Sequence, residues 1–189
     1  MILATLCYVK DRSRFLMLHR NKRLEDLHFG KWNGLGGKVQ SGETPEECAV
    51  REVWEESTLV ATKLQFNGVV SFPKFDGQDD WYVFVYTVST LPGEPIAGPE
   101  GSLHWVESKK VLALNLWEGD RVFLPYVFEG VFFSAKLIYE NGGLKDFAMW
   151  EAWERGLQGV EQLQRQRARA GAELPDLVGP GAAQGLRQL

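Results

Sequence analysis

The sequence predicts a mixed α+β domain with a helical extension behind it. Short runs of β-branched, aromatic and apolar residues bounded by turn residues are typical of strands, and they recur along the first 147 residues. One strongly signalled helix interrupts these runs, which is the pattern of a mixed domain. The composition changes after Phe147, so we expect a domain over residues 1–147, an amphipathic helix over 148–170 and a loosely ordered tail over 171–189.

The bulk composition limits the class of function. At 189 residues the chain can form one domain with an appendage, and its 44% apolar and 24% charged residues are ordinary for a globular protein. Its net charge of −4 argues against a nucleic-acid polymer as partner, because such partners usually require a basic stripe. A small anionic ligand stays compatible, since a metal ion or a few local Arg and Lys side chains can supply the attraction.

The cysteines and the first residues indicate a cytoplasmic protein. Cys7 and Cys48 are far apart, so we expect free thiols in a reducing compartment and no disulfide framework. The run MILATLCYVKDR places its apolar residues before its charges, unlike a signal peptide, and it is far too short to span a bilayer. We therefore expect no membrane association, and a strand that begins almost at once.

The expected strands follow one another with turns between them. Residues 3–9 and 14–19 predict a hairpin around the polar KDRS. Residues 31–39, KWNGLGGKV, combine glycines with apolar anchors, which indicates a strand that is bent or closely approached at its glycines. Further strands are expected at 68–75 and 81–88 around the turn DGQDD, at 102–106, and at 132–144, where Asn141-Gly142 marks a turn.

Two helices are expected within the domain. In the first, at residues 44–57, Thr44 can act as N-cap, Pro45 fits the first helical position and Glu47 completes a capping box. The second is expected around residues 117–128. Apolar residues at helical spacing predict the helix of 148–170, which can pack on the domain or on a second copy, so a monomer and a homodimer both stay open. These apolar residues are Met149, Trp150, Trp153, Leu157, Val160 and Leu163.

The first helix carries an acidic cluster. At about 100° per residue, Glu52, Glu55 and Glu56 share an arc of about a quarter turn. Ala49 and Val53 lie beside this arc, where they can pack the helix on a sheet. Such a cluster is often a solvated helix face. Alternatively, converging carboxylates would hold Mg²⁺ or Mn²⁺, hard cations that bind oxygen ligands and keep waters for a phosphate substrate.

The whole string decides between these two interpretations. Gly37 is followed after five residues by Glu43, and after seven more by REVWEE at 51–56, with the aliphatic Leu59 close behind. This string resembles the Nudix box, G-x5-E-x7-R-E-U-x-E-E-x-G-U with U an aliphatic residue, at every position except the final glycine, which is Thr58 here. The resemblance implies a Nudix α/β/α sandwich with a mixed β-sheet, extended by the C-terminal helix.

The resemblance also implies residue roles. The carboxylates of the cluster bind the metal and help to deprotonate water, while Glu43 holds Arg51, which offsets the clustered charge. Thr58 would then alter the end of the helix and leave the chemistry unchanged. The implied catalytic residues are Glu43, Arg51, Glu52, Glu55 and Glu56, and the implied metal ligands are Gly36 through its carbonyl, Glu52, Glu55, Glu56 and Glu100.

The flanks of the box resemble the MutT-like members of the family, which hydrolyse oxidised purine nucleoside triphosphates such as 8-oxo-dGTP. The likeness covers residues 4–147 and includes GKWNGLGGKVQSGET, WYVFVY, LWEGD and FFSAKLIY. In these relatives an asparagine and a tryptophan–acid segment hold the base, and the matching positions are Asn33, Trp117 and Asp120. An Asn amide suits the amide edge of a purine, an indole can stack on its ring, and a carboxylate can accept from the N7–H that 8-oxoguanine has and guanine lacks.

Other positions match substrate contacts of the same relatives more loosely. Gly119 stands where the mammalian members carry a further acid, so we do not expect their acceptance of oxidised adenines to carry over. Without the resemblance, Trp117 would be read as a core residue, Asn33 as a turn residue and Glu100 as a solvated loop residue. The additional substrate contacts implied are Thr5, Arg20, Gly37, Lys38 and Phe72.

The sequence therefore predicts a pyrophosphohydrolase that depends on Mg²⁺ or Mn²⁺ and converts oxidised purine nucleoside triphosphates, chiefly 8-oxo-dGTP, to the monophosphate and pyrophosphate. Its expected partner is a small-molecule nucleoside triphosphate, with no nucleic acid and no membrane. Two alternatives stay open. One is a Nudix pyrophosphohydrolase of broad specificity for (d)NTPs or dinucleotides. The other is a catalytically silent nucleotide-binding domain, against which the intact arginine and glutamates of the box argue.

Overall fold

The structure is a computed structural model that describes residues 1–151, in which eight strands and three helices are found. The strands are β1 (Ile2–Asp11), β2 (Arg14–His19), β3 (Trp32–Asn33), β4 (Ala61–Phe72), β5 (Trp81–Thr90), β6 (Ser102–Glu107), β7 (Phe133–Glu140) and β8 (Gly143–Glu151). The helices are α1 (Pro45–Ser57), α2 (Ser108–Val111) and α3 (Asp120–Glu129). None of the helices in this part of the chain is long and apolar enough to cross a membrane.

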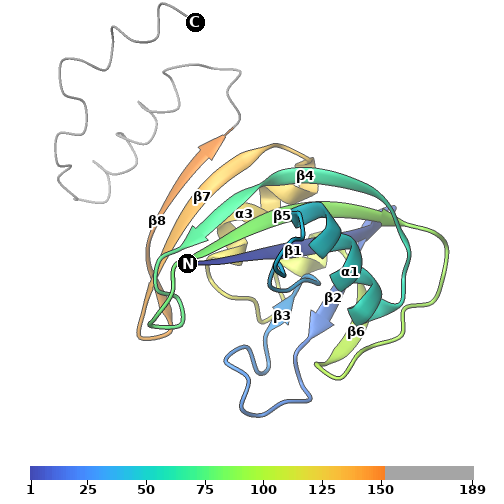
Figure 1. Ribbon diagram of the computed structural model, residues 1–189, viewed down its shortest axis with the longest axis horizontal. Coiled ribbons are helices and arrows are strands. Elements are labelled where there is room, and N and C mark those ends of the chain that lie inside the picture. The colour runs from blue at the N-terminus through green and yellow to red at the C-terminus, as the bar shows by residue number, and fades with distance from the viewer. Residues whose placement is uncertain (152–189) are drawn as a thin grey trace, which may run out of the picture. The chain divides into compact units, whose positions relative to one another are not determined.

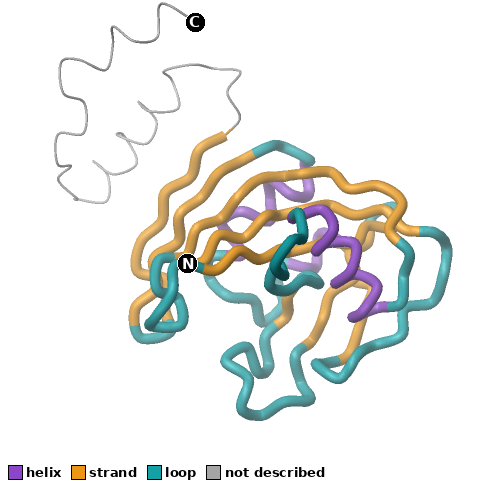
Figure 2. The backbone as a smooth tube through the Cα atoms, viewed as in Figure 1, coloured by secondary structure: helices purple, strands orange, loops and turns teal. Residues whose placement is uncertain are grey.

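The strands form one mixed sheet in the order β3-β2-β1-β5-β4-β7-β8, with β6 also pairing on β2. β1 runs parallel to β5 and β4 runs parallel to β7, whereas the other neighbours are antiparallel. The sheet is strongly curved, with α1 on one face and α3 on the other (Figure 1 and Figure 2). These layers are those of the α/β/α sandwich that the sequence predicts.

Alternation along β1 sends its side chains to two cores, one under each of these helices. Cys7 and Val9 belong to the core under α1, whereas Tyr8 belongs to the core under α3. Cys7 and Cys48 are free and buried, as expected. The core under α1 also contains Leu16, Leu18, Leu35, Ala49, Val53, Tyr86 and Val88. The core under α3 also contains Phe15, Met17, Val70, Val85, Phe123, Leu124, Val127, Phe133 and Leu137.

Helix α1 begins with the predicted capping box. The Thr44 hydroxyl accepts from the Glu47 amide at 3.2 Å, and Glu47 Oε2 accepts from the Thr44 amide at 2.8 Å. At the other end Thr58 adopts a left-handed backbone with φ of 60°, and its amide donates to the carbonyl of Trp54. Glycine reaches this conformation without the steric cost that a β-branched residue incurs. The departure from the box therefore lies at the cap of the helix, away from the carboxylates.

The structure corrects the prediction at the end of the domain. Met149 and Trp150, expected in a helix, lie in β8 and pair with β7. The turn at Asn141-Gly142 returns the chain antiparallel to β7, and this pairing outweighs the helical spacing of the apolar residues, because Met149 also packs against the core under α3. The sheet thus continues past the expected boundary at Phe147 to Glu151. The rest of the predicted helix and the tail lie outside the described residues.

Two strands also differ in extent from the prediction. β4 begins at Ala61, well before the expected position 68, and contains irregularities in its pairing with β5. The strand expected at 31–39 is regular only at Trp32–Asn33, and the segment that follows runs beside β1 through bridges at Leu35 and Lys38. A Cβ on Gly36 would lie 2.2 Å from the carbonyl oxygen of Thr5, so a glycine is required where this segment approaches β1.

Candidate active site

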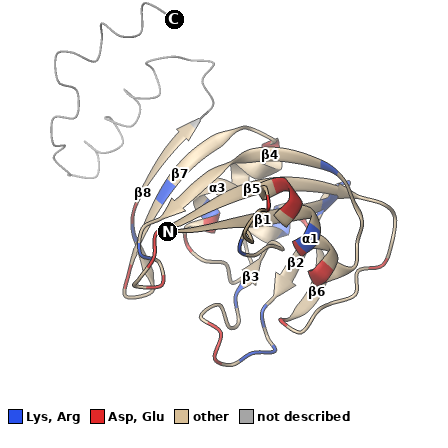
Figure 3. Cartoon of the chain, viewed as in Figure 1, with Lys and Arg blue, Asp and Glu red and all other residues tan. Residues whose placement is uncertain are grey.

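The acidic cluster lies where α1 meets the glycine-rich segment that follows β3. Acidic positions gather along α1 with a basic position among them (Figure 3). Glu56 is 8% exposed, and its Oε2 accepts a hydrogen bond of 2.8 Å from the Gly36 amide. A Cβ on Gly37 would lie 2.3 Å from Oε1 of Glu52. The two glycines therefore let the backbone pass directly beside the carboxylates.

Arg51 holds the carboxylates of the box together. Its Nε donates to Glu43 Oε1 at 2.6 Å and its Nη2 donates to Glu43 Oε2 at 3.0 Å, which is the bidentate geometry of a strong charge-assisted pair. Its Nη1 donates to Glu52 at 2.6 Å and to Glu55 at 3.1 Å. The hydrogen bonds from Arg51 lower the pKa of Glu43 to about 2. The pair predicted between Glu43 and Arg51 is thus present, and Arg51 also spans two of the clustered glutamates.

Burial makes the innermost carboxylates unfavourable as anions. Burial raises the pKa of Glu56 to about 8, and the charges of Glu100 and Glu52 add to this effect, while the hydrogen bond from Gly36 opposes it. Burial also raises the pKa of Glu52, against the lowering effect of Arg51. These raised pKa values mean that the negative charge of the two carboxylates is incompletely neutralised where they are largely buried.

The donor chemistry of this place fits a hard divalent cation. Glu52, Glu56 and Glu100 supply carboxylate oxygens, which Mg²⁺ and Mn²⁺ prefer, and a cation among them would relieve the repulsion. Within residues 1–151, no group of three or more Asp, Glu, His or Cys side chains is already arranged to hold a metal ion. The side chain of Glu55 is 54% exposed and paired with Arg51, so it is the least buried of the predicted carboxylate ligands.

Arg20 and Glu100, both predicted as site residues, meet beside the cluster. Arg20 Nη1 donates to Glu100 Oε2 at 2.7 Å, and Arg20 Nε donates to Asp26 Oδ2 at 2.6 Å. Arg23 Nη1 lies 3.5 Å from the other oxygen of Glu100. Because the charge of Glu100 also acts on Glu56, this carboxylate connects the loop of residues 20–31 to the acidic cluster.

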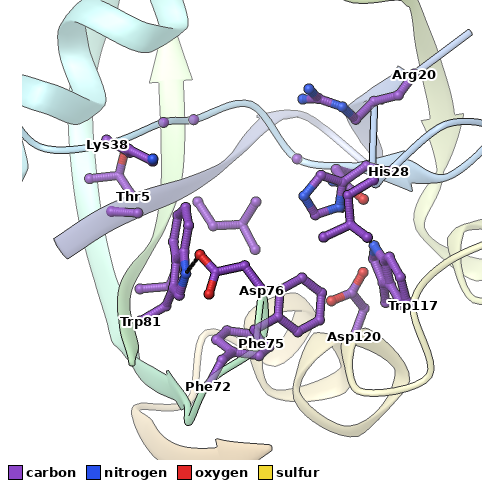
Figure 4. Close-up of a pocket in the computed structure, with 18 of the residues that line it drawn as sticks. Thr5, Arg20, His28, Lys38, Phe72, Phe75, Asp76, Trp81, Trp117 and Asp120 are labelled. Carbon is purple, nitrogen blue, oxygen red and sulfur yellow. Dashed lines mark hydrogen bonds between the residues drawn. The ribbon is translucent and has the colours of Figure 1, made fainter. Parts of the chain in front are cut away.

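A cavity of about 320 Å³ opens next to the cluster and is lined by every residue predicted to touch the substrate. Thr5 and Lys38 lie at one end of it, and Trp117 and Asp120 lie at the other (Figure 4). The sequence-predicted residues that line the cavity are Thr5, Arg20, Asn33, Gly36, Gly37, Lys38, Phe72, Glu100, Trp117 and Asp120. The end of the cavity at Trp117 and Asp120 is called the aromatic end below. The cavity therefore reaches from this aromatic end to the glycines that border the carboxylates.

Two buried polar groups belong to this cavity. Asn33 Oδ1 is buried and has no hydrogen-bond partner among the described residues. Asp120, at the start of α3, is 7% exposed, and burial raises the pKa of its carboxyl to about 7. A buried acceptor without a partner is costly in free energy. A ligand that offers N–H donors would give Asn33 Oδ1 a first partner, and it would add to the backbone hydrogen bond from Trp117 that already lowers the pKa of Asp120.

Position 119, next to Asp120, has no room for an acidic side chain. The amide of Gly119 donates to the hydroxyl of Tyr139 at 2.8 Å, and a Cβ on Gly119 would lie 2.7 Å from the same oxygen. Tyr139 thus fills the space that a larger residue at position 119 would need. Position 119 therefore supplies no second acid beside Asp120.

Sequence reasoning missed several residues that line the cavity, among them His28, Phe75, Trp81 and Tyr139. The ring of Phe75 lies 5.3 Å from that of Trp117 and 5.1 Å from that of Tyr139, between ring centroids. Trp117 Nε1 donates to His28 Nδ1 at 2.9 Å. His28 and Phe75 come from loops, where no periodic pattern marks a residue. The only signal for His28 is its place shortly before the glycine-rich segment.

Comparison with known proteins gives a consistent result. Residues 2–127 match the NUDIX domain family. The chain is 36% identical over 128 residues to the oxidized purine nucleoside triphosphate hydrolase of Danio rerio, covering 67% of this chain and 80% of that protein. It is 33% identical over 127 residues to the mouse (Mus musculus) protein of the same name, with the same coverage. The crystal structure of the MutT protein from Bacillus halodurans matches with a TM-score of 0.71 and 26% identity, over 79% of this chain and 97% of that chain.

Proposed function

This chain belongs to the Nudix hydrolase family, and we propose that it hydrolyses oxidised purine nucleoside triphosphates, chiefly 8-oxo-dGTP, to the nucleoside monophosphate and pyrophosphate. The relatives named oxidized purine nucleoside triphosphate hydrolase support the substrate class. Removal of 8-oxo-dGTP from the nucleotide pool would keep a polymerase from inserting the damaged base. The expected partner is this small molecule.

The observation that carries the proposal is the composition of one cavity. Its aromatic end combines the indole of Trp117 with the unpartnered Asn33 Oδ1 and the buried carboxyl of Asp120. A purine can stack on the indole and donate its edge N–H groups to these oxygens. The N7–H of 8-oxoguanine would suit the carboxylate of Asp120, whereas the N7 lone pair of guanine would oppose it.

The other end of the cavity supports hydrolysis of the triphosphate. Gly36 and Gly37 bring the backbone beside Glu52 and Glu56, and Lys38 lies at the same end (Figure 4). A divalent cation held by the carboxylates would offset the charge of the polyphosphate and lower the pKa of the attacking water. Water oxygen bonds to a phosphorus atom, a phosphoanhydride bond breaks to release pyrophosphate, and a carboxylate of the cluster accepts the proton that the water loses.

Two alternatives differ from this proposal, one in the range of nucleotides that it hydrolyses and the other in hydrolysing none. A broad-specificity pyrophosphohydrolase would need the same carboxylates and would be indifferent to Asp120. A silent nucleotide-binding domain would need the cavity without the charged cluster. The bidentate pair between Arg51 and Glu43 and the buried Glu56 favour a catalyst, because such charge concentration is costly without a role in catalysis or metal binding.

The test is product analysis with 8-oxo-dGTP and Mg²⁺, followed by ³¹P NMR. We expect equal amounts of 8-oxo-dGMP and pyrophosphate, no reaction in EDTA, and recovery of activity on adding Mg²⁺ or Mn²⁺. Release of orthophosphate in place of pyrophosphate would contradict the proposed reaction. Binding of 8-oxo-dGTP without turnover, in either metal, would support the silent domain.

A further inference from the structure

His28 belongs to the loop between β2 and β3 and lines the cavity close to the aromatic end. Its amide donates to Asp26 Oδ1 at 2.9 Å, and the other oxygen of Asp26 accepts from Arg20 at 2.6 Å. The carboxylate of Asp26 therefore ties His28 to Arg20 within the loop. This anchoring fixes where the imidazole of His28 stands in the cavity.

The hydrogen bond with Trp117 fixes the tautomer of His28. An indole N–H can only donate, so the His28 Nδ1 that accepts it at 2.9 Å must carry a lone pair. The hydrogen of the neutral ring is then on Nε2. Burial lowers the pKa of His28, which favours the neutral ring that this bond requires. His28 thus offers one N–H donor that is directed away from Trp117.

This donor is not used within the described part of the chain. Of the two ring nitrogens, only Nδ1 has a hydrogen bond among residues 1–151. In Figure 4 the ring of His28 lies above Asp120 and beside Trp117, on the same side of the cavity. A donor on His28 and a carboxyl on Asp120 therefore lie at the same end of one ligand pocket.

The geometry points to His28 as a base-recognition residue, which donates from Nε2 to a purine carbonyl oxygen while Nδ1 holds the indole of Trp117. The inference rests on the proposed function and adds a residue to it. In 8-oxoguanine, N7–H stands between the carbonyl oxygens O6 and O8. A carboxylate that accepts from N7–H and an imidazole that donates to a neighbouring carbonyl together match this edge. A base with an amino group in place of that carbonyl oxygen would set an N–H donor against the N–H donor of the imidazole, which is unfavourable.

Two variants of His28 separate this role from mere support of Trp117. In His28→Gln the amide nitrogen can take the place of Nε2, so the distal donor is kept and the acceptor for Trp117 is lost. In His28→Asn the amide oxygen can take the place of Nδ1, so the acceptor is kept and the distal donor is lost. If His28 recognises the base, the Gln variant should bind the nucleotide more tightly than the Asn variant. If His28 only positions Trp117, the Asn variant should bind more tightly.

The measurements are the Kd for 8-oxo-dGMP by calorimetry, which does not depend on turnover, and kcat and KM for 8-oxo-dGTP. We expect His28→Gln to stay within about fivefold of the wild-type Kd and His28→Asn to weaken binding about twentyfold or more. The loss should appear in KM, with kcat within about threefold, because the base contact is remote from the phosphates. Thermal unfolding of both variants establishes that they fold, and His104→Asn and His104→Gln, at the exposed position of β6, serve as matched controls.

An Asn variant that binds as well as or better than the Gln variant would overturn the inference, and so would equal losses or no loss in both. The wild-type protein tests the proposed function separately. Equal kcat/KM for 8-oxo-dGTP and dGTP would contradict a preference for the oxidised base. The ranking of the two His28 variants could still be read with dGMP, which retains O6.

Discussion

The backbone amide of Gly36 donates to the side chain of Glu56 across 2.8 Å, and this bond joins the glycine-rich segment to the last turn of α1. This hydrogen bond holds the buried carboxylate of Glu56 between the cavity and the acidic cluster. Its pKa is raised to about 8 by burial and by the charges around it, so this part of the protein is organised around a carboxylate that lacks a full counter-charge. The same arrangement that is unfavourable alone suits a cation and an attacking water.

Glu56→Gln keeps the shape of the side chain and removes its charge. We expect kcat/KM to fall by about 10²–10⁴-fold, because a ligand or proton acceptor at the reacting centre is lost. The melting temperature should not fall, since a buried carboxyl is replaced by a neutral amide. Glu94→Gln, at an exposed position, is the matched control and should retain full activity. Unchanged turnover by Glu56→Gln would remove Glu56 from the catalytic set.

Arg51→Lys keeps the charge and loses the fork that grips Glu43 with two hydrogen bonds. Because Arg51 also fixes Glu52, we expect kcat to fall by about ten- to hundredfold through misplacement of the carboxylates. The free energy of unfolding in urea should also drop, because the two hydrogen bonds to Glu43 are lost. Arg14→Lys, in the more exposed pair with Asp11, should change the free energy of unfolding by less than about 0.5 kcal/mol. Equal effects in the two variants would contradict a special role for Arg51.

Asp120 makes stability depend on pH. Its pKa is raised from 3.8 to about 7 in the folded protein, so between these values the unfolded chain loses its proton first. The contribution of Asp120 to stability is therefore fully present below about pH 4 and is lost as the pH rises through 7, by up to about 4 kcal/mol. Asp120→Asn should lose this dependence and be more stable than the wild type at pH 8.

The comparison is made by urea unfolding at pH 5 and pH 8 for the wild type, Asp120→Asn and the exposed control Asp146→Asn. The difference between wild type and Asp120→Asn should be larger at pH 8, whereas Asp146→Asn should follow the wild type. Parallel pH profiles for all three proteins would mean that Asp120 does not have a raised pKa.

Thr58→Gly should stabilise the protein by about 0.5–1.5 kcal/mol. The left-handed φ of 60° at this cap costs a β-branched residue more than it costs glycine, although glycine gains entropy in the unfolded chain. Activity should be unchanged, since the cap touches none of the carboxylates. Thr62→Gly, in strand β4, is the control and should destabilise, because glycine weakens a strand. Urea unfolding of both variants decides; a loss of stability in Thr58→Gly would be the contradicting result.

The sequence was most informative where a contact depends on local spacing. The capping box of α1 and the pair between Arg51 and Glu43 follow from fixed intervals along the chain, and both are present. It failed where a partner strand decides the outcome: Met149 and Trp150 have helical spacing, and only pairing with β7 reveals them as a strand. His28 escaped notice because its environment is made by residues distant in sequence.

The central claim is that this cavity reads the oxidised base, and it is tested most directly by kcat/KM for 8-oxo-dGTP and dGTP measured side by side in Mg²⁺. We expect a preference of about a hundredfold or more for 8-oxo-dGTP, which corresponds to about 2.7 kcal/mol in transition-state stabilisation, with pyrophosphate released from both. Equal values for the two nucleotides would contradict base reading by Asn33 and Asp120 and would leave a Nudix hydrolase of broad specificity.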